Sequence, residues 1–127
     1  MSPQGALELV LFRWGTLELA LPRDRVQALE ADRDPCQPSI GDLLGLPAAA
    51  PGLMRLLLVA GPDGTLRIRV QEPVTRVRLP AAAIHPLPPL LAARLRLPWV
   101  RALAHRPGQG PGVLTVILDP VGPGTPC

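Results

Sequence analysis

The 127-residue chain has few aromatic residues and neither lysine nor tyrosine. Phe12, Trp14 and Trp99 are the whole aromatic set, so aliphatic side chains must fill most of the core, and we expect both tryptophans in it. No apolar run approaches the ~18 residues that a membrane-spanning helix needs. The opening residues also lack the cationic segment of a secretion signal. These absences predict a cytoplasmic protein. The chain length predicts a single domain over residues 1–120, with a loose tail at 121–127.

Cysteine and histidine are equally scarce, with two residues of each. Cys36 and Cys127 are too few and too far apart in the chain for a disulfide framework. Either cysteine could pair with His85 or His105, but no motif supplies the third group that would orient such a nucleophile. The spacing of these four residues fits no zinc-ligand pattern, and no phosphate-binding loop or HExxH motif occurs. The sequence therefore predicts no enzyme activity, no metal and no cofactor.

Proline and glycine are abundant, with 18 and 12 residues, and they divide the chain into short apolar segments. This punctuation is typical of a β-rich domain with tight turns. Residues 7–14 are largely apolar at both alternating sets of positions, which predicts a strand buried on both faces. Residues 17–21 are apolar at odd positions only, which predicts a strand with one wet face. Gly15 suits the first position of a type II′ turn between these strands.

Further elements follow from local signals. Residues 22–25 predict one helical turn, and residues 26–29 fit either a strand or a continuation of that helix. Ser39 can cap a helix over 40–46 that ends near Gly45. Residues 54–60 and 65–71 predict two strands around a Gly-Pro-Asp-Gly turn. Pro73 is expected to end the second of these, with a further strand at 74–79. Residues 80–89 predict a polyproline-like segment, and 99–105 and 113–118 a final strand pair.

All 13 basic residues are arginine, and the formal net charge is +3. Arg67, Arg69, Arg76 and Arg78 form the one charged constellation, because their spacing places each pair on one face of its strand. If the two strands pair, four guanidinium groups line the solvent face of a hairpin. Such a face is most often simply solvated. The functional alternatives are a dock for an acidic protein surface and the nucleic-acid face of a small basic β-barrel, for which three aromatic residues offer little stacking surface.

Five motifs in order resemble the CheW-like adaptor domain of bacterial chemosensory systems. They occupy residues 7–27, 40–47, 57–79, 84–89 and the closing strands at 99–104 and 113–120. The resemblance implies a mainly β fold, a CheW-like pair of small SH3-like β-barrels with short helices. It also implies a non-catalytic scaffold for chemotaxis or gliding motility. The implied partners are a chemoreceptor-like protein, a CheA-type histidine kinase or another CheW-like protein, and a homodimer is a further alternative.

The resemblance also assigns candidate partner-binding residues, Val26, Gln27, Ala28 and Leu29, to which we add the four arginines. Because apolar residues usually lie inside, Val26 and Leu29 are also candidates for the core. Ala28 stands where the family carries an acidic residue. The family's segment with an Asn-Leu-Arg-Gly strand is missing between residues 31 and 38, as in shortened members similar to FrzB of the Frz gliding-motility system. One of the two barrels is therefore expected to be incomplete.

Overall fold

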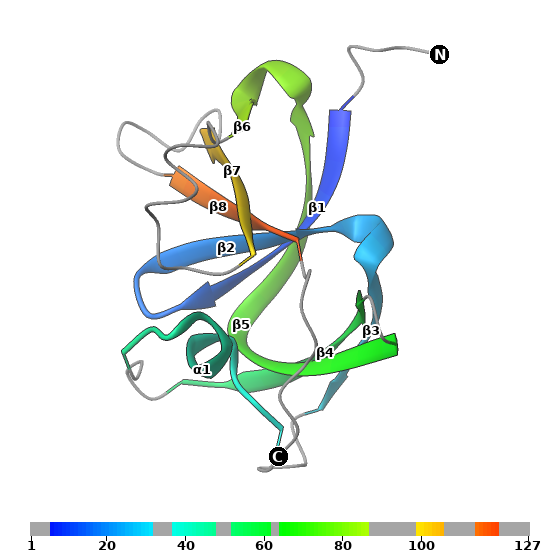
Figure 1. Cartoon of the computed structure of the whole chain (residues 1–127), viewed down its shortest axis with the longest axis vertical. Helices are drawn as coiled ribbons and strands as arrows, with labels where there is room; N and C mark the ends of the chain where they lie inside the picture. The colour runs from blue at the N-terminus through cyan, green and yellow to red at the C-terminus, as the bar shows by residue number, and fades with distance from the viewer. Residues whose placement is uncertain are drawn as a thin grey trace.

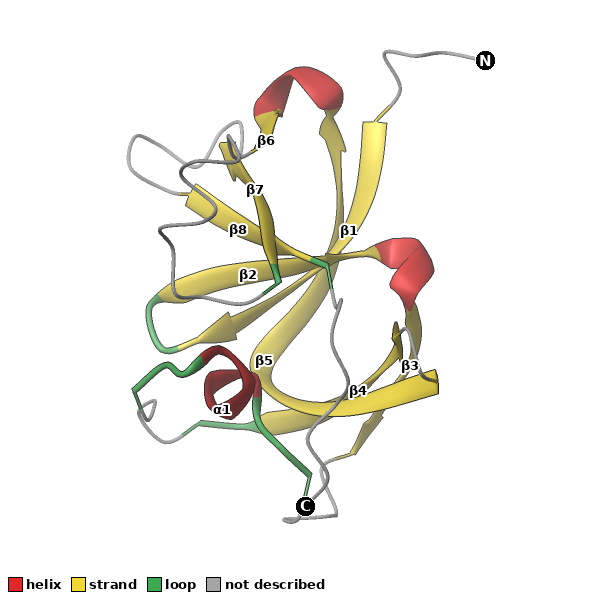
Figure 2. Cartoon of the chain, viewed as in Figure 1, coloured by secondary structure: helices red, strands yellow, loops and turns green. Residues whose placement is uncertain are grey.

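The computed structural model describes residues 6–31, 37–47, 52–61, 64–86, 99–105 and 114–119. Within them lie eight strands, one α-helix and two 3-10 turns (Figures 1 and 2). In chain order these are β1 (Ala6–Trp14), β2 (Leu17–Pro22), η1 (Arg23–Arg25), β3 (Val26–Ala31), α1 (Ile40–Leu44), β4 (Met54–Gly61), β5 (Gly64–Pro80), η2 (Ala81–Ala83), β6 (Ile84–Pro86), β7 (Val100–His105) and β8 (Leu114–Leu118). The predicted mainly β class is confirmed.

The strands form one sheet in the order β3-β4-β5-β1-β2-β8-β7-β6. All neighbouring strands run antiparallel except β2 and β8, which run parallel. The sheet curls strongly, and α1 lies beside the C-terminal end of β1 and the bend of β5 in the view of Figure 2. Strands from the two ends of the chain therefore meet at the middle of the sheet, where β2 contacts β8.

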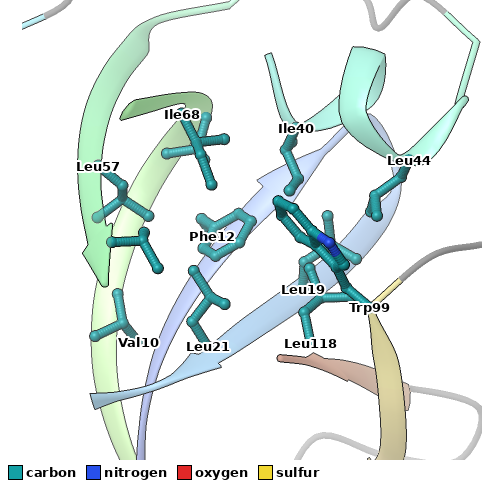
Figure 3. Close-up of a cluster of buried hydrophobic side chains, with 12 residues drawn as sticks. Val10, Phe12, Leu19, Leu21, Ile40, Leu44, Leu57, Ile68, Trp99 and Leu118 are labelled. Carbon is teal, nitrogen blue, oxygen red and sulfur yellow. The ribbon is translucent and has the colours of Figure 1, made fainter. Parts of the chain in front are cut away.

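The middle of strand β1, from Leu9 to Phe12, is buried on both faces as the sequence predicts, whereas Leu7 near its start is exposed. Val10 and Phe12 belong to the larger of two hydrophobic clusters, and Leu9 and Leu11 belong to the smaller one. Figure 3 shows the larger cluster, with Phe12 at its centre. The larger cluster comprises Val10, Phe12, Leu19, Leu21, Ile40, Leu44, Leu57, Val59, Ile68, Val70, Trp99 and Leu118. The smaller comprises Leu9, Leu11, Ala20, Leu79, Ala102, Ala104 and Ile117.

The two tryptophans differ in burial. Trp99 is buried within the larger cluster, as predicted. Trp14 is only half-buried and packs against the outside of that cluster. Its ring lies against Gly41 of α1, and its Nε1 donates a hydrogen bond to the carbonyl oxygen of Pro47 at 2.9 Å. The indole of Trp14 therefore fastens the helix segment to the first hairpin.

The prediction of a wet face on β2 is wrong. Ala20 is fully buried, and Glu18 is only 9% exposed. The reason is that this face of β2 lies in the smaller hydrophobic cluster, with Ala20 opposite Ile117 of β8, and the same parallel pairing places Thr115 opposite Glu18. Thr115 Oγ1 donates a hydrogen bond to Glu18 Oε1 at 2.7 Å, so the polar position of β2 is satisfied inside the protein.

The local signals for turns and caps are confirmed. Gly15 has φ +63°, and Thr16 is not among the described residues with positive φ, as a type II′ turn requires. Ser39 Oγ accepts a hydrogen bond from the Asp42 N–H, and Asp42 Oδ2 accepts one from the Ser39 N–H. This capping box starts α1, which ends at Leu44 with Gly45 in the left-handed conformation. The helix is thus two residues shorter than predicted.

Pro73 does not end a strand. β5 continues through Pro73 for 17 residues, with a cis peptide bond between Glu72 and Pro73. β5 pairs with β4 from Gly64 to Gln71, and with β1 at Gln71 and again from Thr75 to Pro80. Proline lacks an N–H to donate to a ladder, and here it falls in the short gap where β5 changes partners. The predicted strands at 65–71 and 74–79 are therefore two halves of one strand.

Three remaining segments are now assigned. Residues 22–25 form the predicted helical turn as η1, with Pro22 as its cap, and residues 26–29 belong to strand β3. Residues 81–86 are not polyproline-like, because η2 leads into β6, which pairs with β7. The final pair, β7 with β8, is confirmed. Cys36, Cys127, residues 87–89 and the tail at 121–127 lie outside the described residues.

Candidate functional site

Five of the eight predicted partner-binding residues line one groove, which we call the β3 groove. It has a volume of about 390 Å³ and lies between β3 and the second half of β5. The five are Val26, Gln27, Ala28, Leu29 and Arg76, and the other lining residues are Val10, Arg23, Leu57, Val74 and Thr75. The sequence separation between residues 26–29 and Arg76 shows that the fold, and not chain proximity, assembles this surface.

The floor of the β3 groove is apolar. Val10 and Leu57 are buried members of the larger hydrophobic cluster, and Figure 3 shows both side chains in it. Val26 and Val74 are half-buried and pack against the same cluster. Leu29 is 37% exposed, which makes it one of the most exposed large apolar side chains among the described residues. The groove is therefore an opening in the wall of the core, and an apolar partner group placed there would be removed from water.

A β-bulge at Gln27 shapes the wall of the groove. The register between β3 and β4 shifts there, so that Val26 lies opposite Val59 and Leu29 lies opposite Leu57. Both partners on β4 belong to the larger cluster, and Val26 and Leu29 therefore face the same side of the sheet although they are three positions apart. Thr65 Oγ1 donates a hydrogen bond to Gln27 Oε1 at 2.8 Å, which links the bulge to β5 across β4.

The predicted face of four arginines on a hairpin is wrong. Arg67 and Arg69 lie opposite Leu58 and Leu56 of β4, whereas Arg76 and Arg78 lie opposite Val10 and Glu8 of β1. The four share one strand, but its two halves pair with different neighbours. Only Arg76 lines the groove.

Sequence reasoning missed a second cation at the groove. Arg23 of η1 lines it together with Arg76, and both side chains belong to exposed residues. The two guanidinium groups give a groove with an apolar floor a positive rim. The signal in the sequence was the position of Arg23 directly before the predicted surface at residues 26–29, but only the fold shows that Arg76 joins it.

A pair of ionic contacts anchors the chain just before β3. Arg25 Nη2 lies 3.4 Å from Asp119 Oδ1, and Arg101 Nη2 lies 3.0 Å from Asp119 Oδ2. The Asp119 N–H donates a hydrogen bond to the carbonyl oxygen of Trp99 at 2.8 Å. These contacts connect η1 to the ends of β7 and β8, so the second half of the chain fixes where β3 begins.

The described residues contain no cluster of three or more His, Cys, Asp or Glu side chains that could hold a metal ion. His85 and His105 are both exposed, on β6 and β7. No helix among the residues that the structure describes is long and apolar enough to cross a membrane. The chemistry that this surface offers is that of a binding site, with apolar contact area and two cationic side chains.

Neither a protein-family model nor a curated protein sequence matches this chain. Among solved structures it is similar to the scaffolding protein TtCheW from Thermoanaerobacter tengcongensis. The TM-score is 0.70, the sequence identity is 13%, and the alignment covers 91% of this chain and 90% of that one. The likeness confirms the CheW-like β fold that the sequence motifs predicted.

Proposed function

We propose that this protein is a non-catalytic adaptor of a bacterial chemosensory pathway that binds a chemoreceptor-like protein through the β3 groove. One coincidence carries the proposal. Residues 26–29 are assigned to partner binding by the resemblance, and all four line an open groove with an apolar floor on a CheW-like fold. A core position and a docking position would be hard to distinguish from sequence, but the exposure of Leu29 favours docking.

The adaptor acts by binding alone. An apolar side chain of the partner enters the groove above Leu57 and Val74, and the release of water from both surfaces supplies affinity. Arg23 and Arg76 at the rim favour a partner with carboxylates at the edge of its contact surface. A change in the partner's activity follows where the adaptor binds one of its conformations more tightly than another.

The finer assignments belong to the same proposal. A CheA-type histidine kinase or another CheW-like protein is a second partner, and the pathway controls chemotaxis or, as in FrzB-like members, gliding motility. The protein acts in the cytoplasm, where these partners have their signalling domains. Its fold likeness to a scaffolding protein over nearly the whole of both chains supports this role.

A pull-down with a matched pair of variants tests the proposal. The bait is the full chain, and the prey are the signalling domain of the chemoreceptor and the CheA-type kinase encoded next to its gene. Leu29→Asp places a carboxylate at the apolar groove and is expected to weaken receptor binding by about tenfold or more. The control is Leu114→Asp on β8, because Leu114 is 50% exposed and does not line the groove.

Wild-type protein that retains neither receptor nor kinase would contradict the proposed function. Equal loss of binding in both variants would instead contradict the assignment of the groove. Circular dichroism of each variant separates a loss of binding from a loss of folding.

A further inference from the structure

Strand β3 ends the sheet on one side. In the described part of the chain its only strand neighbour is β4. The outward-pointing N–H and C=O groups of an edge strand can pair with another chain. In β3 the Glu30 carbonyl oxygen also accepts a hydrogen bond from Arg55 Nε at 3.3 Å, an exposed contact that an added strand can replace. β3 thus offers a ladder of backbone hydrogen bonds in addition to the side chains of the groove.

The two edges of the sheet are built differently. At the other end, β6 is three residues long and ends in Pro86, and short strands and prolines are the usual protection of an exposed edge. β3 has six residues, no proline and a single charged residue, Glu30. Beyond the bulge at Gln27, residues 28–31 pair with β4 in unbroken register. This run of β3 is therefore a regular template for one more strand.

The β3 groove lies on the face of the sheet that an added strand would extend. Val26 and Leu29 point from β3 into the groove, so every second side chain of a strand added beside β3 would point to the same face. Those side chains would meet an apolar floor and the guanidinium groups of Arg23 and Arg76. Arginine pairs with carboxylates through two parallel hydrogen bonds, so the rim selects an acidic segment.

We propose that β3 accepts an extended segment of a partner protein as an additional strand, with apolar and acidic side chains alternating on its groove face. Main-chain hydrogen bonds to β3 supply affinity, and the groove and its two arginines supply selectivity. The inference rests on the proposed docking function of the groove and deepens it, because it names the conformation and chemistry of the segment that docks.

A synthetic peptide tests the pairing directly. The probe is an acetylated octapeptide, TVTETVTE, in which valine and glutamate occupy one face of an extended chain. It is titrated to about 1 mM into the full-length, isotopically labelled protein, and amide chemical shifts are followed by NMR. We expect saturable shifts of the β3 amides and of the groove residues. An absence of such shifts would overturn the proposal.

Two N-methylated probes distinguish strand addition from other docking modes. One carries methyl groups on all threonine nitrogens, and the other carries them on all valine and glutamate nitrogens. In an added strand only one of these two sets of N–H groups points toward β3. We therefore expect one methylated probe to lose about tenfold or more in affinity and the other to bind as before. Equal effects of the two methylations would overturn the proposal.

A charge exchange tests the role of the rim. Arg76→Glu is expected to weaken binding of the probe by about tenfold and to favour a probe with lysine in place of glutamate. The control is Arg67→Glu, because Arg67 is an exposed arginine of the same strand outside the groove. Equal effects of the two substitutions would overturn the proposal. Sedimentation showing a dimer whose β3 amides are already protected would do the same, since a second copy would then occupy the edge.

The outcome for the peptide is separable from the outcome for the proposed function. Retention of the receptor domain without any binding of the probe would refute strand addition and leave the adaptor function standing. Binding of the probe without retention of receptor or kinase would refute the chemosensory function and support the strand-accepting edge.

Discussion

Thr115 and Glu18 meet where the last strand of the chain joins one of the first. Thr115 is fully buried, Glu18 is 9% exposed, and Thr115 Oγ1 donates a hydrogen bond to Glu18 Oε1 at 2.7 Å. Valine has nearly the shape of threonine, so Thr115→Val removes the hydroxyl and little else. Leaving a buried polar group without one of its partners costs about 1–3 kcal/mol, and Glu18 Oε1 loses this bond inside the protein. We expect the free energy of unfolding to fall by about 2 kcal/mol.

The measurement is urea unfolding followed by far-UV circular dichroism and tryptophan fluorescence. In a thermal melt of a domain of this size, the same loss of unfolding free energy corresponds to a midpoint temperature lower by about 8 °C. Thr65→Val is the matched control, because Thr65 Oγ1 also donates to a side-chain oxygen, Gln27 Oε1, at 2.8 Å but in an exposed setting. Water replaces that bond, so its loss is expected to cost below about 0.5 kcal/mol. Equal effects of the two substitutions would refute the reasoning that burial of Glu18 makes its bond costly to lose.

Two other substitutions probe the contacts around the groove and the helix. Gly41→Ala would drive a Cβ into the indole of Trp14, and we expect a loss of about 1–3 kcal/mol with a shift in tryptophan emission. Gly52→Ala is its control, since a Cβ there meets only the end of one flexible side chain. Unchanged tryptophan emission in Gly41→Ala would argue against the contact between Gly41 and Trp14. Asp119→Asn weakens the contacts with the two arginines and is expected to cost less than about 1 kcal/mol, because these pairs are partly exposed. Unfolding in 1 M salt should erase that difference, and a difference that persists there would point to a role other than charge.

The sequence predictions succeed where local interactions determine an element, and they fail where residues from a distant part of the chain determine it. Both faces of β1 are apolar in the sequence, and burial on both sides follows wherever the strand lies in the sheet. Gly15 and the Ser39 capping box depend on atoms a few residues away, so local patterns suffice for them. The face of β2 depends on Thr115 and its strand, which come from the other end of the chain. Alternation of polar and apolar residues cannot show whether a distant strand will cover the polar side.

The candidate site was likewise predictable only in part from the sequence. Residues 26–29 were assigned to a binding surface by resemblance, and they do line the groove. The bulge at Gln27, which turns Val26 and Leu29 to one face, breaks the simple period of two and so contradicts the pattern on which a strand prediction depends. The arginines were grouped by assuming that Pro73 ends a strand. Since β5 continues through that proline and changes neighbours there, Arg76 reaches the groove and Arg67 does not.

The way in which β3 is held in place connects the fold with its proposed use. A central strand is fixed by ladders on both sides, but within the described residues β3 pairs with β4 alone. Side-chain contacts supplement that single ladder: Thr65 bonds to Gln27, Arg55 Nε donates to the Glu30 carbonyl oxygen at 3.3 Å, and Asp119 holds Arg25 just before the strand. These contacts fix the position of β3 without occupying the groove. A surface organised in this way is ordered before a partner arrives, so less conformational entropy is lost on binding and more of the contact energy appears as affinity.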